Sequence, residues 1–161
     1  MFRSGCCRFN HPSPIWCSCA RRVCRNEVVN PVLTESFGFF NNTAVGTIVA
    51  NATLPLNIVE ISGSGISSNG AGAINLASGT YQVSYLASGE ISASGTLSVR
   101  LQINGSTVNG SAISSSEDAG DVESLTQTIV LRTAGGVLEI VNNSSATNFS
   151  LASVLVRRIG D

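Results

Sequence analysis

The residues best suited to covalent or metal chemistry are confined to the first 24 positions of this chain. The thiols are Cys6, Cys7, Cys17, Cys19 and Cys24, and the only histidine, His11, lies among them. Structural zinc sites usually have two paired C-x₂₋₄-C spacings, and these positions do not provide two such pairs. Disulfides formed in an oxidising exterior are therefore the favoured interpretation, and a zinc site is the alternative.

The cysteine count is odd, and the positions after Cys24 hold no further cysteine. One chain therefore cannot pair all of its thiols internally. If every thiol is oxidised, at least one disulfide joins this chain to a second polypeptide. The alternative is that one thiol stays free.

No catalytic constellation is visible. A Ser-His-Asp triad or a histidine-based metal centre needs a histidine, and His11 is the single candidate. The sequence predicts a protein that is not an enzyme, with no catalytic residues and no cofactor. Four acidic residues cluster in one segment, at Glu117, Asp118, Asp121 and Glu123. Clustered carboxylates suit calcium, but the glycine and ligand spacing of a calcium loop is missing, so we expect a solvated loop and no metal.

Residues 1–30 are interpreted as an extended, Cys-rich N-terminal connector arm. Pro12 and Pro14 fix their own φ angles and bias the preceding residues away from helix. The segment has too few aliphatic residues to build a core of its own. It contains Ile15 and Trp16, which could anchor the arm in a groove of another subunit, since buried tryptophans often dominate interfaces. The alternative is a Trp16 packed against its own chain.

Composition excludes several classes of partner. Only 12% of the residues are charged, there is no lysine, and the formal net charge is −1, so we expect no nucleic-acid partner. No apolar run reaches the roughly 18 residues of a membrane span, and we expect no membrane association. The N-terminus has no apolar stretch of the kind found in secretory signals, so export by the standard route is not expected.

Residues 31–161 are predicted to form one all-β domain. In the stretch 79–104, Tyr81, Val83 and Tyr85 alternate with polar residues, and after a Gly/Ser turn Leu97 and Val99 do the same. This period of two predicts a pair of half-buried antiparallel strands. Further strands are expected at 33–40, 47–50, 54–61, 73–76, 108–113, 125–132, 137–142 and 149–159, with Ile66 isolated in a loop. Many short strands separated by turn signals indicate a β-sandwich or barrel, here a ten-strand antiparallel jelly roll.

The final strand, 149–159, is apolar on both faces. Phe149, Leu151 and Leu155 share one face, while Val154 and Val156 share the other. A strand with one solvated face should alternate. We therefore assign the first face to the core and place Val154 and Val156 in an interface with a neighbouring subunit. The alternative is a central strand covered by loops of its own chain.

The order of motifs resembles the globular head of the tumour necrosis factor and complement-type superfamily. Five segments carry the likeness: FGFFNNTA, LPLNI, GISSNGAGAINLASGTYQVSYLAS, GTLSVRLQINGSTVNGSA and SLASVLVRRI. Together they are most similar to the C-terminal domain of BclA-like exosporium collagen-like glycoproteins of spore-forming bacteria. The resemblance implies a jelly-roll protomer, a homotrimer, a location on the spore surface and synthesis without a secretory signal.

The sequence departs from that family in having the Cys-rich arm where the collagen-like stalk would be, and in lacking the family's N-terminal targeting motif. We therefore expect a self-assembling structural subunit of an exosporium layer or an endospore appendage fibre. Its head would trimerise, and its arm would reach an identical subunit or a spore-coat or exosporium anchor protein. Three chains also bring an odd number of cysteines, so full oxidation would place a disulfide outside the trimer. The alternative function is a receptor- or carbohydrate-binding tip of a surface filament.

Overall fold

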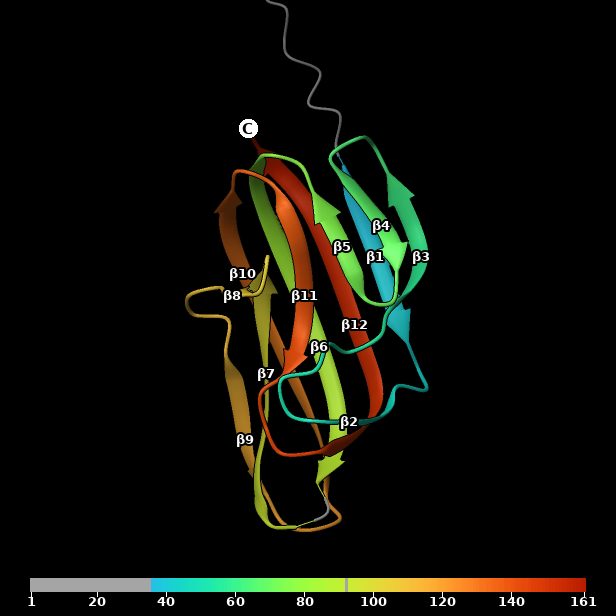
Figure 1. Cartoon of the computed structure of the whole chain (residues 1–161), viewed down its shortest axis with the longest axis vertical. Helices are drawn as coiled ribbons and strands as arrows, with labels where there is room; N and C mark the ends of the chain where they lie inside the picture. Colours follow the sequence, from blue (N-terminus) through green and yellow to red (C-terminus); the bar gives the residue numbers. More distant parts are fainter. Residues whose placement is uncertain (1–35, 92) are drawn as a thin grey trace, which may run out of the picture. The chain divides into compact units, whose positions relative to one another are not determined.

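A computed structural model describes residues 36–91 and 93–161, with the backbone alone at Glu117. The chain divides into two units, Met1–Val32 and Leu33–Asp161, and all described residues belong to the second. That unit consists of strands and loops (Figure 1). Its strands are β1 (Phe37–Asn42), β2 (Gly46–Ile48), β3 (Asn57–Ser62), β4 (Ile66–Gly70), β5 (Ala73–Leu76), β6 (Gly79–Ile91), β7 (Gly95–Ile103), β8 (Ser106–Thr107), β9 (Ile113–Glu117), β10 (Val122–Thr133), β11 (Gly136–Asn142) and β12 (Thr147–Gly160).

The strands form two antiparallel sheets that face each other as a sandwich. Sheet A has the order β10-β6-β12-β1-β3, with β2 beside β12. Sheet B has the order β4-β5-β11-β7-β8, with β9 beside β7. The all-β jelly-roll class is thereby confirmed, although the described residues contain twelve strands rather than ten. Within this part of the chain, no helix is long and apolar enough to cross a bilayer.

The core lies between the inner faces of the two sheets. The predicted alternation is confirmed, because Tyr81, Val83 and Tyr85 of β6 are buried, as are Leu97 and Val99 of β7. These two strands do not pair with each other, however. Strand β6 pairs with β10 and β12 in sheet A, while β7 pairs with β9 and β11 in sheet B. They are consecutive strands of opposite layers, and their apolar faces meet across the sandwich.

Two local expectations are wrong. Ile66 does not lie in a loop; it opens β4 and is almost fully buried. Residues 108–112 do not form a strand, because Ser111 N–H donates to the carbonyl of Val108 and closes a turn, and only Ile113 of the expected strand lies in one, as the first residue of β9. Gly110 adopts a φ of 75°, which a turn tolerates and a strand does not.

The turn at 108–111 is fixed by buried polar groups. The Ser111 hydroxyl accepts a hydrogen bond from Leu101 N–H and lies 2.7 Å from the Val108 carbonyl oxygen, to which it can donate. The Tyr85 hydroxyl contacts the Ser111 carbonyl and the Gln127 side-chain oxygen, and Gln127 Nε2 donates to the carbonyl of Gly110 at 2.8 Å. This network joins the turn, which follows β8 of sheet B, to β6 and β10 of sheet A.

Candidate functional site

The outer face of sheet A carries a group of partly exposed large apolar side chains. We call it the outer patch, and it consists of Phe37 and Phe39 of β1, Leu86 of β6, and Leu151 and Leu155 of β12. Directly opposed residues of antiparallel strands share a face, so the pairing register places these side chains together. Leu155 is 44% exposed. The described loops of the chain therefore do not cover this part of β12.

The register arranges the outer face in rows across four strands. One row runs from Phe39 through Leu155 and Ser84 to Thr128. The row beside it runs through Ser153, Leu86 and Thr126. Neither row contains a charged residue between β1 and β10. These two rows can be covered by another protein surface without burying an ion, whereas Arg157 lies opposite Phe37 at the margin of the patch.

Two pairs of hydroxyl groups on this face are already hydrogen-bonded to each other. Ser84 Oγ lies 2.8 Å from Thr128 Oγ1, and Ser124 Oγ donates to Ser88 Oγ at 3.1 Å. A buried polar group without a partner costs about 1–3 kcal/mol. Because these groups satisfy one another within the sheet, covering them costs less than covering free hydroxyls. The outer face is therefore suited to becoming an interface.

The assignment of Val154 and Val156 to an outward interface is wrong. Their exposed fractions are 1% and 0%, and both belong to the core of the sandwich. The opposite face of β12, with Leu155, is the one that points outward.

A β-bulge explains the error. The register of β12 against β6 shifts between Phe149 and Leu151, so that Ser150 is an extra residue. Because side chains alternate along a strand, one extra residue moves every later side chain to the other face. Phe149 points into the core before the bulge, and Val154 points into it afterwards. The sequence shows only that both faces of this strand are apolar, which does not locate the bulge.

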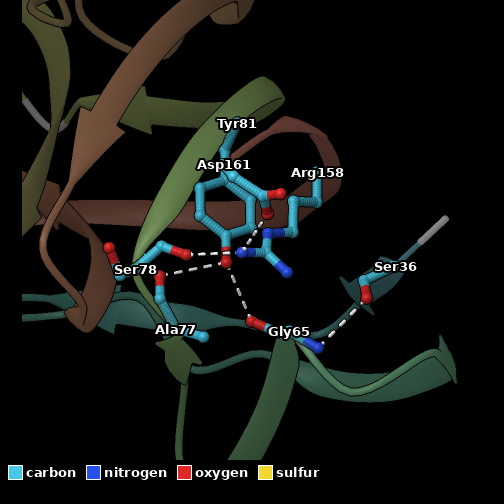
Figure 2. A network of polar contacts seen from close by, with 7 residues as sticks. All are labelled: Ser36, Gly65, Ala77, Ser78, Tyr81, Arg158 and Asp161. Carbon is cyan, nitrogen blue, oxygen red and sulfur yellow. Dashed lines mark hydrogen bonds and ion pairs between the residues drawn. The ribbon is translucent and has the colours of Figure 1, made fainter. Parts of the chain in front are cut away.

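The first described residue is held firmly by its neighbours, as Figure 2 shows. Ser36 is fully buried, its carbonyl accepts a hydrogen bond from Arg158 N–H at 2.8 Å, and its hydroxyl accepts one from Gly65 N–H at 3.0 Å. The Arg158 guanidinium in turn donates to the carbonyl of Ser78 and pairs with Asp161 at 2.8 Å. The chain therefore enters the head at a fixed point between β4 and β12.

Tyr81 belongs to the same network. Its hydroxyl lies 3.0 Å from each of the carbonyl oxygens of Gly65 and Ala77, which share its one proton. Burial raises the pKa of Tyr81, while the positive charge of Arg158 and the hydrogen bond to Ala77 act in the opposite direction. The alternation of the sequence placed Tyr81 in the core but gave no sign of its polar role, since nothing in the local pattern identifies the carbonyl groups of Gly65 and Ala77 in the connections before β4 and β6 as its partners.

The acidic segment, which was expected to be a loop, runs from Glu117 at the end of β9 through a turn to Glu123 in β10. Asp121 N–H donates to the carbonyl of Asp118, and Gly120 N–H donates to the carbonyl of Ile91. Among the described residues, no group of three or more histidine, cysteine, aspartate or glutamate side chains is placed to hold a metal ion.

The candidate disulfide and docking residues of the arm lie outside the described residues. They are Cys6, Cys7, Cys17, Cys19, Cys24, Ile15 and Trp16.

Several solved structures share this fold. Murine APRIL is similar with a TM-score of 0.62 and 13% sequence identity, over 78% of this chain and 99% of APRIL. Eiger TNF from S. frugiperda is similar with a TM-score of 0.61 and 14% identity, over 80% of this chain and 94% of Eiger. PRD1 vertex protein P5 is similar with a TM-score of 0.53 and 18% identity, over 77% of this chain and 96% of P5. No protein-family model and no curated protein sequence matches the chain. The head therefore has a jelly-roll fold of the tumour necrosis factor type, and at these identities the likeness concerns the fold alone.

Proposed function

We propose that this protein is a structural subunit of a bacterial spore-surface fibre or exosporium layer. Three jelly-roll heads associate, and the Cys-rich arm of residues 1–30 links each trimer to a neighbouring subunit or to an anchor protein. The protein acts by assembly and not by catalysis. The resemblance of the head sequence to BclA-like exosporium proteins supports the location, and the fold shared with tumour necrosis factor-type proteins supports a head that associates with copies of itself.

The observation that carries the proposal is the outer patch. A lone protomer leaves Leu155 at 44% exposure beside Phe39, on a sheet face whose central rows contain no charge. Burying apolar surface contributes about 25 cal/mol per Å², and the patch is continuous across β1, β12 and β6. Association through this face would remove the patch from water and leave the paired hydroxyls of Ser84 and Thr128 satisfied.

The arm supports the second part of the proposal. A connector between subunits should leave the head at a defined position, and Ser36 is held there by Gly65 and Arg158. All of the thiols lie on the arm side of that position. Disulfides formed by the arm would therefore join assemblies to one another without any change within the heads.

A binding tip is the second candidate function. The similar structures reported above include murine APRIL, Eiger TNF and PRD1 vertex protein P5, so the fold alone does not separate a tip from a fibre subunit. A tip and a fibre subunit could share the same head. They differ in that a tip ends a filament, while a fibre subunit repeats along it.

Imaging separates these functions. Purified full-length protein should form filaments in negative stain, with a repeat that is constant along each filament. Antibody labelling of spores should place it at the outer surface. Discrete trimers that never grow, but bind a glycan or receptor preparation, would favour the tip. Monomeric particles at high concentration would contradict both functions.

A further inference from the structure

We propose that Asn109 is a site of spontaneous deamidation, which converts it to aspartate and isoaspartate in the folded protein. The chain has three Asn-Gly pairs, at Asn69, Asn104 and Asn109. An asparagine followed by glycine is chemically vulnerable because glycine has no side chain to hinder attack by its own nitrogen. In the folded structure, the three pairs differ in whether the asparagine side chain or the glycine N–H is hydrogen-bonded.

The Asn109 pair is restrained at neither reacting atom. Asn109 and Gly110 are both exposed and occupy the centre of the turn closed by Ser111 and Val108. Among the described residues, the Asn109 side chain has no hydrogen-bond partner, and no backbone acceptor is paired with Gly110 N–H. The side-chain carbon and the attacking nitrogen are therefore both available.

The Asn104 pair is held by its side chain. Asn104 has a φ of 51° in the tight turn between β7 and β8, and its Oδ1 accepts a hydrogen bond from Val137 N–H at 2.9 Å. A Cβ on Gly136 would lie only 2.5 Å from the Asn104 side-chain nitrogen, which shows how closely the amide is packed. To react, the amide would have to break this contact and rotate away.

The Asn69 pair is held at the attacking atom. Gly70 N–H donates to Ser68 Oγ at 3.1 Å, and Ser68 Oγ itself donates to the carbonyl of Ala73 at 2.7 Å. The reaction needs the Gly70 nitrogen to lose its proton. A hydrogen bond from that N–H stabilises the protonated form and so slows the attack.

The reaction at Asn109 needs only water. The Gly110 nitrogen attacks the Asn109 side-chain carbon, and a C–N bond forms while the bond to the amide nitrogen breaks. The proton from Gly110 passes through solvent to the leaving group, which departs as ammonia and leaves a five-membered succinimide. Water then opens the ring at the side-chain carbonyl to give aspartate, or at the main-chain carbonyl to give isoaspartate.

Isoaspartate would lengthen the backbone of the turn by one methylene. The bond from Ser111 N–H to the Val108 carbonyl and the bond from Gln127 to the Gly110 carbonyl both span this segment. We therefore expect the modified protein to lose part of the contact between the turn and β10. In a subunit that stays assembled for long periods, such products would accumulate.

Peptide mass spectrometry of the full-length protein tests the proposal. Folded protein is incubated in mildly alkaline buffer, and deamidation is detected by the increase in peptide mass when NH₂ is replaced by OH. The rate of this change at Asn109 should be several-fold higher than at Asn104 or Asn69. In denaturant the three rates should become similar, because the restraints are removed. Equal rates at the three sites in folded protein, or a slower rate at Asn109, would overturn the proposal.

Two variants test the mechanism. Asn109→Gln should abolish the fast modification and leave the other two sites unchanged. Ser68→Ala removes the acceptor of Gly70 N–H and should raise the rate at Asn69 severalfold, with Asn109 in the same sample as the internal reference. If Ser68→Ala keeps the wild-type melting temperature and leaves Asn69 as slow as before, the proposed protection is wrong. If it lowers the melting temperature, the comparison of folded and denatured wild-type protein decides the outcome.

Discussion

Leu155 on β12 lies directly opposite Phe39 on β1, whereas its chain neighbour Val154 lies directly opposite Phe40. Val154 and Phe40 are each only 1% exposed, while Leu155 is 44% exposed. Two adjacent cross-strand pairs thus serve different purposes. The inner pair stabilises the sandwich, and the outer pair is the centre of the surface that we propose for association.

Leu155→Asp should abolish association and leave the β-structure of the head intact. A carboxylate at a desolvated interface without a partner costs several kcal/mol, but the same group is solvated on a free protomer. Sedimentation velocity should show the variant as a protomer, with a wild-type circular dichroism spectrum.

Val154→Asp and Val49→Asp are the matched controls for this substitution. Val154→Asp places the same charge in the core and should unfold the head. Val49 is 62% exposed and is not part of the outer patch, so Val49→Asp should leave both folding and association unchanged. If Leu155→Asp sediments as the wild-type oligomer, the outer patch is not the interface.

The sequence allowed the buried faces of β6 and β7 to be predicted, but not the strands that lie beside them. The alternation of Tyr81, Val83 and Tyr85 identifies the buried face of β6 because burial acts on each residue locally. Which strands lie beside β6 depends on pairing with segments far away in the chain. Strands β10 and β12 fill these positions, and no local pattern distinguishes them from β7.

The interface was assigned to the wrong face of β12 because the strand contains one extra residue. Phe149 and Leu151 are two positions apart and therefore seem to share a face, but the bulge at Ser150 places them on opposite faces. Apolar residues on both sides of β12 predict two covered faces, of which the structure confirms the inner one. The choice between them needs the position of the bulge, which depends on the partner strands.

Tyr85→Phe should weaken the head at neutral pH. It removes a buried hydroxyl that contacts the Ser111 carbonyl and Gln127, and leaving buried polar groups without a partner costs about 1–3 kcal/mol. Urea unfolding of the variant and the wild type at neutral pH measures the difference. An unchanged free energy of unfolding would mean that these acceptors find water instead.

The same variant should lose less stability at alkaline pH. Burial raises the pKa of Tyr85 from 10 to about 12, so the folded state keeps a proton that the unfolded state releases. Protonated Tyr85 therefore contributes to the free energy of unfolding of the wild type. This contribution is complete below pH 10 and is lost as the pH rises through the folded-state pKa, which lowers the free energy of unfolding by on the order of 2 kcal/mol. The gap in stability between wild type and Tyr85→Phe should therefore narrow over this range. A constant gap would contradict the raised pKa.

Chelation should leave assembly and thermal stability unchanged. We expect the head to be held by its core and the arm by disulfides, so that no bound metal contributes to the folded state. Differential scanning calorimetry and negative stain, each with and without EDTA, test this expectation. A large fall in melting temperature on chelation would restore the zinc alternative for the arm cysteines.

Deleting residues 1–26 should leave a head that folds and trimerises but assembles no further. The deletion removes all of the thiols together with Ile15 and Trp16, and none of the described core residues.

Changing all of the cysteines to serine should have a milder effect than the deletion, since Ile15 and Trp16 could still dock. A disulfide contributes about 2–4 kcal/mol, chiefly by limiting the unfolded or dissociated ensemble. Its loss should therefore reduce the resistance of the assembly to heat and detergent more than it reduces association of the subunits. Assemblies of the serine variant should therefore separate in hot detergent without reductant, whereas wild-type assemblies should need reductant. Denaturing gel electrophoresis with and without reductant makes the comparison. If wild-type protein runs as a monomer in both lanes, the arm is not a covalent connector and the fibre proposal loses its second part.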